Sequence, residues 1–549
     1  MEIDMHYQAT YLAARLAGFD KPQATTIAHA AQYVDESDMS RLQDKDAGFW
    51  IRDFKPHPTV QSTNELIRDT VNLWKWDSST RTGWSEAYLR HLRRVWACFH
   101  FLPGNYGPDA PFSYEGPTEA RGWRYDDQCA EEFSMLCLTN SPLVANMVND
   151  LLNHQDQPYL PHLIGVRMHV LADTWAHTYF AGTPSWCVNE ADNPVTRVFP
   201  DGSTAEIKWG PGGQGREEFS PGTSLSYWGM PFLGHGRMGH LPDYPFMRYM
   251  YPAKWSGQPI FKNNPRDYLN GMGQMIQAMR CVLTGQPFVI NQYAPLSEDV
   301  TFKINALVQM LENTDASVRT RKWAEALDSW TFDGQCFGAP PPFRADAWLD
   351  EYKRTALENQ PGTDYYRFNQ AAVRHVQLVG DVLRTDAAIT IQENPNCAVQ
   401  RVQLASRSGR PVYIGPMSRS STLLGGIKYC FPRAATSPIS LQLVMVDGRQ
   451  ALETGGLVKI ITEESAVGPE DCLGDWRTSD SLYYYYDGYA PTRQSWLLEK
   501  ADGSKGPIRS GDAIRLRNQE TTKAISCGRE WLSTSSGTSA DTEWVIHYL

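Results

Sequence analysis

The sequence predicts a multidomain protein: an all-α N-terminal domain with long loops, followed by an all-β C-terminal domain of the β-trefoil type. Helical periodicity continues to about residue 386, whereas short strands separated by turn residues fill the chain from residue 398. A chain of 549 residues is long enough for about two to four separate cores. We therefore expect domains at 1–386 and 398–549, joined by a linker at 387–397.

Amphipathic stretches bounded by helix start and stop signals predict the N-terminal domain. The first runs from Thr10 to Gly18, and Pro22 opens the second, which runs through 24–34. Further helices are expected at 85–101, 129–138, 143–153, 161–180, 265–283, 297–313, 317–329 and 369–384. The stretch 182–252 is dense in Gly, Pro, Trp and Tyr. A loop of that length inside a domain is usually functional.

An internal repeat predicts the C-terminal architecture. VQRVQLAS, GLVKIITEE and AIRLRNQE place Leu404, Ile460 and Leu516 in equivalent positions, 56 residues apart each time. Each unit ends in a similar second strand: LQLVMVD, SWLLEKAD and EWVIHYL. Three β units in about 150 residues match the arithmetic of a β-trefoil, because no single unit can bury its apolar face alone. The GDAIRLR segment resembles MIR-type trefoils, and Gln494-Ser-Trp496 resembles a ricin-type QxW triplet.

Composition and charge exclude several classes of protein. The formal charge of −11 and the pI near 5.7 argue against a main role in binding nucleic acid. The polar N-terminus predicts no signal peptide, and no apolar run reaches the length of a transmembrane helix. We expect a cytoplasmic protein, or one exported by a specialised secretion route. The ten scattered cysteines, with no CxxC pair, predict mostly reduced, buried thiols.

Histidines are distributed unevenly: twelve of the 13 lie before residue 380. The strongest group is in HLIGVRMHVLADTWAHTYF, where His169, Asp173 and His177 follow one another at intervals of four residues. On a helix this spacing keeps the three side chains within about 80° of one another. Since their neighbours are apolar, we expect a buried helix whose carboxylate and two imidazoles hold a divalent cation. The alternative is a helix with core histidines that have no metal.

Two more candidate ligand groups precede this helix. Asp4 and His6 are separated by one residue, which places both side chains on one face of an extended segment. Asp35 closes a helix whose body is apolar. For each group, an ordinary solvent-exposed position remains the alternative.

A fourth group lies in FLGHGRMGHLPDYPF, inside the long Gly/Pro-rich stretch. Here His235, His240 and Asp243 stand among glycines and Pro242, which allow the backbone to fold tightly around a small target. An aromatic-rich surface loop is the alternative interpretation.

The HxxxDxxxH pattern, the N-terminal ligand segment and the helical body together resemble the superfamily of zinc-dependent phospholipase C and fungal single-strand nucleases. The blocks DMHYQATYLAARLAGF…AQYVD, HxxxDTWAHTYF and GHGRMGHLPDYPF also resemble a little-characterised microbial domain family. These resemblances imply a metallohydrolase-like domain with two or three zinc ions. The superfamily also uses its N-terminal amine as a ligand, whereas Met1 is expected to lie too far away. The expected metal ligands are Asp4, His6, Asp35, His169, Asp173, His177, His235, His240 and Asp243.

The expected activity is zinc-dependent hydrolysis of a phosphoester, of the phospholipase C type on phospholipid head groups. Adjacent divalent ions activate a water and stabilise both oxygens of an in-line displacement, and Asp35 or Asp243 can act as general base. The trefoil is expected to bind a glycan, a membrane surface or another protein. Two alternatives remain open: a non-enzymatic toxin or lectin-like binding protein, and a nuclease or HD-type phosphohydrolase.

Overall fold

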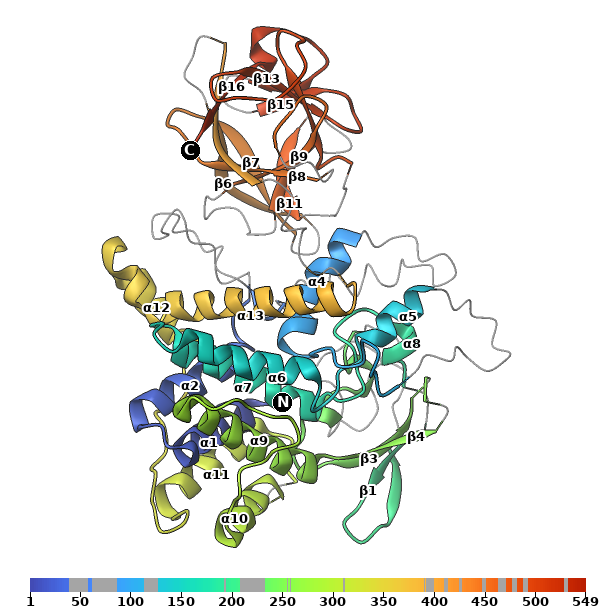
Figure 1. Cartoon of the computed structure of the whole chain (residues 1–549), viewed down its shortest axis with the longest axis vertical. Helices are drawn as coiled ribbons and strands as arrows, with labels where there is room; N and C mark the ends of the chain where they lie inside the picture. The colour runs from blue at the N-terminus through green and yellow to red at the C-terminus, as the bar shows by residue number, and fades with distance from the viewer. Residues whose placement is uncertain are drawn as a thin grey trace.

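Among the residues that the structure describes, helices predominate before residue 390 and strands predominate after it (Figure 1). The computed structural model describes residues 1–38, 58–61, 86–112, 127–191, 194–207, 233–253, 255–256, 258–309, 312–389, 391, 399–408, 413–423, 427–446, 451–462, 471–475, 481–486, 492–527 and 532–549. Most of the expected linker, 387–397, therefore lies outside the described residues.

The described helices of the N-terminal region largely follow the predicted boundaries. In chain order they are η1 (Asp4–Ala9), α1 (Thr10–Ala17), α2 (Lys21–Tyr33), α4 (Glu86–Phe99), α5 (Asp127–Ser134), α6 (Pro142–Asn149), η3 (Asp150–His154), α7 (Leu160–Ala176), α8 (Trp186–Asn189), η5 (Gly236–Met238), η6 (Leu241–Asp243), α9 (Asn264–Thr284), α10 (Glu298–Gln309), α11 (Ala316–Ser329), α12 (Ala347–Arg354), η7 (Leu357–Gly362) and α13 (Asp364–Asp386).

Local sequence explains where the first helices begin and end. Gly18 closes α1 with a φ of +116°, a left-handed conformation that glycine adopts without a Cβ clash. The carboxylate of Asp20 then accepts a hydrogen bond of 2.8 Å from the backbone N–H of Gln23, and Pro22 lies in the first turn of α2. The predicted starts and stops of these two helices are confirmed.

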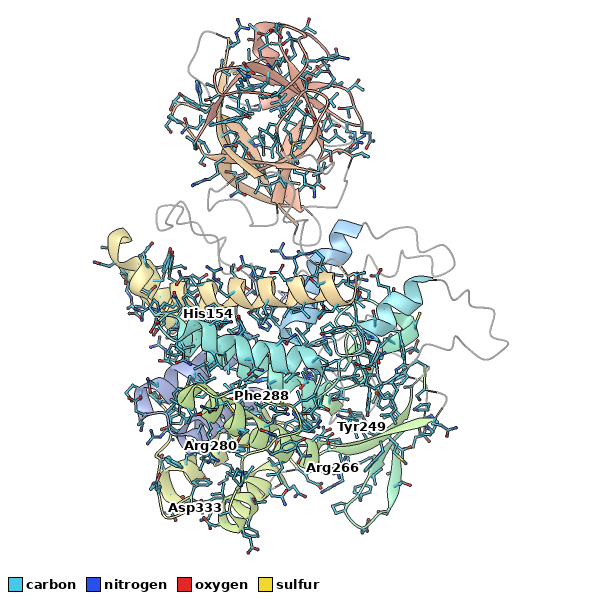
Figure 2. The ribbon with its side chains drawn as sticks, in the orientation of Figure 1. His154, Tyr249, Arg266, Arg280, Phe288 and Asp333 are labelled. Carbon is cyan, nitrogen blue, oxygen red and sulfur yellow. The ribbon has the colours of Figure 1, made fainter. Side chains whose placement is uncertain are left out.

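Helix α7 lies at the centre of the helical region and packs against α2, α9 and α13. Figure 2 shows side chains filling the space around it. Nearly all of its residues are buried, as predicted. Gly165 allows an especially close approach to α2: a Cβ at this position would lie 2.3 Å from the carbonyl oxygen of Ile27 and 2.6 Å from the Cβ of Ala30. The C-terminal end of α2 is therefore held directly against the middle of α7.

The N-terminal region is not all-α, and this part of the predicted fold class is wrong. Four antiparallel strands form a sheet in the order β2-β1-β3-β4. They are β1 (Val195–Val198), β2 (Thr204–Ile207), β3 (Arg248–Pro252) and β4 (Pro259–Asn263). Three of them fall in the stretch expected to be a loop, because strands of four or five residues are too short for alternation to stand out among Gly and Pro.

The described part of the C-terminal region forms a closed six-stranded barrel with six additional strands. The barrel strands pair in the cycle β5-β8-β9-β12-β13-β16-β5. They are β5 (Val399–Ser406), β8 (Leu441–Met445), β9 (Leu457–Thr462), β12 (Trp496–Lys500), β13 (Ala513–Asn518) and β16 (Trp544–Tyr548). The additional strands are β6 (Tyr413–Leu423), β7 (Ile427–Ala435), β10 (Asp471–Asp475), β11 (Leu482–Tyr486), β14 (Ala524–Cys527) and β15 (Leu532–Ser535), and a short helix η8 (Ala540–Thr542) precedes β16.

This architecture corrects the predicted β-trefoil. The predicted repeat does place Leu404, Ile460 and Leu516 at fully buried positions of β5, β9 and β13. The additional strands, however, range from four to eleven residues, and β11 pairs with β7 while β10 pairs with β9. A repeat of core positions specifies the period of the barrel strands but leaves the lengths and pairing of the strands between them undetermined.

Two other sequence-based expectations concern membranes and thiols. Among the described residues, no helix combines the length and hydropathy required to cross a bilayer. Six described cysteines are reduced thiols, whereas Cys187 is disulfide-bonded. The expectation of mostly reduced cysteines is thus confirmed for the described residues, with Cys187 as an exception.

Candidate metal centre

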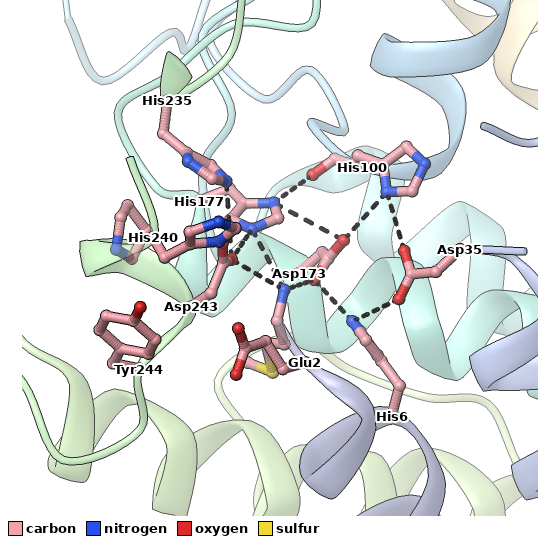
Figure 3. A network of polar contacts seen from close by, with 12 residues as sticks. Glu2, His6, Asp35, His100, Asp173, His177, His235, His240, Asp243 and Tyr244 are labelled. Atoms are coloured by element: carbon pink, nitrogen blue, oxygen red, sulfur yellow. Dashed lines mark hydrogen bonds and ion pairs between the residues drawn. The ribbon is translucent and has the colours of Figure 1, made fainter. Parts of the chain in front are cut away.

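Helix α7 supplies the middle of a buried cluster of imidazoles and carboxylates (Figure 3). One turn separates His169 from Asp173, and His169 Nε2 lies 3.1 Å from Asp173 Oδ2. The helix ends at Ala176, so His177 is its C-terminal capping residue, and its Nδ1 lies 3.6 Å from the same Oδ2 atom. All three side chains are buried and face one another, as their spacing predicted.

The N-terminal segment brings His6 to α7 but turns Asp4 away from it. His6 Nε2 lies 3.2 Å from Asp173 Oδ1, and the His6 ring stacks on that of His169. Asp4 instead forms a bidentate ion pair with Arg319: Nε donates to Asp4 Oδ2 at 3.0 Å and Nη2 donates to Asp4 Oδ1 at 3.1 Å. The expectation of an extended segment was wrong: residues 4–9 form a π-helix, in which positions two apart point to nearly opposite sides. Asp4 is therefore not in the cluster.

Asp35 and His100 complete this side of the cluster. Asp35 Oδ1 lies 3.8 Å from both His100 Nδ1 and His169 Nε2, and its side chain remains 27% exposed. His100 follows the C-terminal end of α4, and its Nδ1 lies 3.5 Å from Asp173 Oδ2. Asp35 was predicted from the sequence, whereas His100 was missed. It stands alone at a helix end, with no ligand-type residue at a helical interval.

The glycine-rich loop forms the other side of the cluster. Asp243 Oδ1 lies 3.0 Å from His177 Nε2 and 3.5 Å from His235 Nε2. His240 approaches only the second oxygen of Asp243, at 3.4 Å, and its side chain is 42% exposed. His235 and Asp243 thus join the cluster as predicted, while His240 lies at its solvent-facing edge.

The amino group of Met1 lies inside the cluster, contrary to the expectation that it is too far away. Its nitrogen is 2.9 Å from Asp173 Oδ1, 3.1 Å from Asp243 Oδ1 and 3.3 Å from His177 Nε2. Burial acts to lower the pKa of this amine, but the carboxylates around it raise the pKa to about 11. In the absence of a metal ion, the ammonium group neutralises part of the carboxylate charge.

Backbone carbonyls hold four of the five clustered imidazoles by one ring nitrogen each. His169, His177 and His235 donate through Nδ1 to the carbonyl oxygens of Ala31, His100 and Gly239, at 2.7–2.8 Å. His100 donates through Nε2 to the carbonyl oxygen of Thr59 at 2.8 Å. Such bonds fix the tautomer and leave the inner nitrogen with a lone pair, the arrangement typical of metal-binding histidines.

Burial keeps three of these imidazoles neutral at ordinary pH. It lowers the pKa of His6, His169 and His235 to about 4. His100 is different, because a hydrogen bond with Asp173 and the charges of Asp35 and Asp173 outweigh burial and raise its pKa. A neutral imidazole is the form that binds a metal ion.

The carboxylates of the cluster outnumber its permanent positive charge. Burial raises the pKa of Asp35. For Asp173 and Asp243 burial acts in the same direction, but neighbouring imidazoles and the Met1 amine hold their pKa well below the usual range. Two buried carboxylates and the partly exposed Asp35 thus lie around one ammonium group, and buried charge of this kind needs further compensation.

The donor set fits divalent metal ions. Three groups each bring their ligand atoms within 4.8 Å of one another: His6, His169 and Asp173; Asp35, His100 and His169; and His177, His235 and Asp243. Nδ1 of His6 has no hydrogen-bond partner, and Asp173 Oδ2 faces imidazole nitrogens at 3.1–3.6 Å. Imidazole nitrogens and carboxylate oxygens are common ligands of zinc. Buried ligand atoms without a hydrogen-bond partner are expected where a metal ion completes the site.

Comparison with known proteins gives a family without an assigned role. Residues 1–383 match a family described as "Family of unknown function (DUF6765)". No curated protein matches the chain. An SDF2-like protein from Arabidopsis thaliana is similar at 12% identity over 27% of this chain and 93% of that chain, with a TM-score of 0.22. A Caenorhabditis elegans protein of unknown function is similar at 10% identity over 28% and 98%, with a TM-score of 0.21. Scores this low assign neither fold nor function.

Proposed function

The chain belongs to the DUF6765 family, and we propose that its helical region is a zinc-dependent phosphoesterase that hydrolyses phospholipid head groups. The supporting observation is the convergence of three adjacent His/Asp groups, two of which share His169. His169 belongs to two of the groups, and Asp173 also approaches His100 and His177 from the other two. Adjacent sites with shared ligands favour two or three ions in one centre, rather than isolated structural ions.

The chemistry requires a general base that water can reach. Bound divalent ions lower the pKa of a water and stabilise negative charge on phosphoryl oxygens. Among the clustered carboxylates, Asp35 is the most exposed and Asp173 is fully enclosed. Asp35 is therefore placed to orient an attacking water and to hold its proton, while Asp173 stays a carboxylate that positions the imidazoles around it.

Charge favours a phospholipid over a polynucleotide. Binding a nucleic-acid strand relies on cationic side chains that neutralise successive phosphates. The chain has a net charge of −11, and the partly exposed carboxylate of Asp35 lies at the edge of the centre. A phospholipid head group has a single phosphodiester and places one phosphoryl group in the centre. It therefore avoids the repulsion that the acidic protein would exert on the successive phosphates of a nucleic acid.

The experiment combines metal analysis with a substrate comparison. Purified protein should contain zinc and should release phosphorylated head groups from phosphatidylcholine vesicles, with single-stranded DNA as the comparison substrate. Chelation should abolish the activity and zinc should restore it. His169→Ala and Asp173→Asn should lose both zinc and activity, whereas His154→Gln, at a partly buried histidine outside the cluster, should keep both.

The two halves of the proposal fail in different ways. Zinc-free wild-type protein without activity, or full activity in His169→Ala and Asp173→Asn, overturns the metalloenzyme. Zinc-dependent cleavage of DNA without cleavage of phosphatidylcholine keeps the metalloenzyme and replaces the substrate class.

A further inference from the structure

Arg319, on α11, contacts both the N-terminal segment and the loop of Asp243. It is only 3% exposed. Its guanidinium donates to both oxygens of Asp4, to a carboxylate oxygen of Glu2 and to the carbonyl oxygen of Asn313. The same group lies over the ring of Tyr244, 5.8 Å from the ring centroid. Tyr244 directly follows Asp243 in the chain.

The N-terminal segment depends on such an anchor. Its helix η1 has no side-chain cap at its first turn, and Asp4 is the first residue of that helix. His6 lies two residues further on and reaches Asp173. The bidentate ion pair between Arg319 and Asp4 therefore fixes the start of the helix that carries His6.

His6 also differs from the other imidazoles of the cluster in how it is held. Backbone carbonyls orient His100, His169, His177 and His235, but Nδ1 of His6 has no hydrogen-bond partner. Its ring is fixed by stacking on His169 and by the backbone of η1. Hydrogen bonds to backbone carbonyls orient the other histidines. The orientation of His6 depends instead on the position of the N-terminal segment that carries it.

We propose that Arg319 is a positioning residue that controls occupancy of the ion bound by His6 and Asp173, and not of the ions bound by the other two groups. This inference rests on the proposed function, since it requires a metal centre. Removing the ion pair between Arg319 and Asp4 releases the start of η1, so the stack on His169 no longer has a fixed backbone to hold His6 in one direction. The groups Asp35, His100, His169 and His177, His235, Asp243 keep their own backbone anchors.

The test compares two variants, each of which changes one partner of the ion pair between Arg319 and Asp4. Arg319→Lys keeps the positive charge but loses the planar guanidinium, and Asp4→Asn keeps the shape of the side chain but loses its negative charge. Zinc per chain is measured after dialysis against a weak chelator, and cobalt is titrated into metal-free protein while its visible absorption is followed. Asp150→Asn is the matched control, because it breaks another ion pair of a buried arginine, Arg167, away from the N-terminal segment.

We expect both variants to lose one ion per chain, or to bind that ion about 10–100-fold more weakly, while the remaining ions are retained. The control should keep the full complement even if it melts at a lower temperature. A purely structural Arg319 predicts full zinc in every folded variant, and that result, or simultaneous loss of all ions, overturns the proposal. Should Arg319→Lys fail to fold, Asp4→Asn decides. Absence of zinc from the wild-type protein overturns the proposed function itself.

Discussion

The imidazole of His6 stacks on that of His169, with ring centroids 3.8 Å apart and 19° between the planes. The stack joins the N-terminal segment to the central helix α7. Two imidazoles can pack in this way when both are neutral, and burial lowers the pKa of each to about 4. The contact therefore serves packing as well as the presentation of nitrogen atoms to an ion.

Replacing His6 by Phe should separate these two roles. Phenylalanine keeps a ring that stacks on His169 but has no ligand nitrogen. Loss of an outer-sphere partner costs about 10–100-fold in metal affinity, so we expect loss of a direct ligand to cost about 100-fold or more. Isothermal titration with zinc measures the affinity, and circular dichroism checks the fold. Unchanged zinc affinity in a folded His6→Phe protein would contradict the assignment of His6 as a ligand.

Acidification should release the ions in order. Protonation competes with metal binding only as the pH approaches the pKa of the imidazole. His169 and His235 have a pKa of about 4, so they stay available at pH 5.5, where an unperturbed surface histidine is mostly protonated. The pKa of His100 is raised, so we expect the ion it helps to bind to leave first.

Zinc content after equilibration at pH 7.0, 5.5 and 4.0 tests this order. His100→Gln removes the ligand that titrates early, so in this variant the first step of release should be missing. A single cooperative loss of all zinc above pH 6 would contradict the prediction.

Gly165→Ala should disturb the contact between α2 and α7. The added methyl would lie 2.3 Å from the carbonyl oxygen of Ile27, so the helices must separate. Overpacking of this kind costs about 3 kcal/mol. It should also move the carbonyl oxygen of Ala31, which orients His169, and so weaken zinc binding. Gly362→Ala, at a position with open space around it, is the control for calorimetric melting and zinc titration. Equal melting temperatures for the two variants would contradict this account.

Asp150→Asn should make unfolding less sensitive to acid. Burial acts to raise the pKa of Asp150, but its ion pair with Arg167, 2.5 Å away, lowers the pKa below the usual value. A carboxyl whose pKa is lower in the folded state adds stability above its unfolded pKa of about 4 and loses it as the pH falls further. The variant leaves the buried guanidinium unpaired, at a cost of about 3 kcal/mol near pH 7.

The difference between wild type and Asp150→Asn should therefore shrink from pH 6 to pH 3. Urea denaturation at several pH values measures it. A difference that stays constant over this range would show that Asp150 does not titrate with folding.

Helical elements and local ligand spacing were predictable because both depend on neighbours in the sequence. The caps at Gly18 and Asp20, and the four-residue interval between His169 and Asp173, carry their structural meaning within one or two turns. The barrel strands were predicted for the same reason, from short alternating stretches with a regular repeat.

The remaining features depend on tertiary contacts that spacing does not record. His100 meets Asp173 from a helix 73 residues earlier in the chain, and nothing in its own segment marks it as a ligand. The error at Asp4 has a local cause. Alternate residues share a face in a strand but not in a helix, and residues 4–9 are helical, so the side chain of Asp4 points away from the side that His6 faces. The prediction of a β-trefoil was wrong because a repeat defines equivalent core positions but not the pairing of every strand.

The ion pair between Asp4 and Arg319 joins positions 315 residues apart. During synthesis Asp4 leaves the ribosome long before its partner exists, and residues are added at only about 5–20 per second. Contacts of such high contact order form late, since the chain entropy must be overcome first. The helical region can therefore pack much of its core cotranslationally, yet its ligand cluster matures only after α11 has emerged.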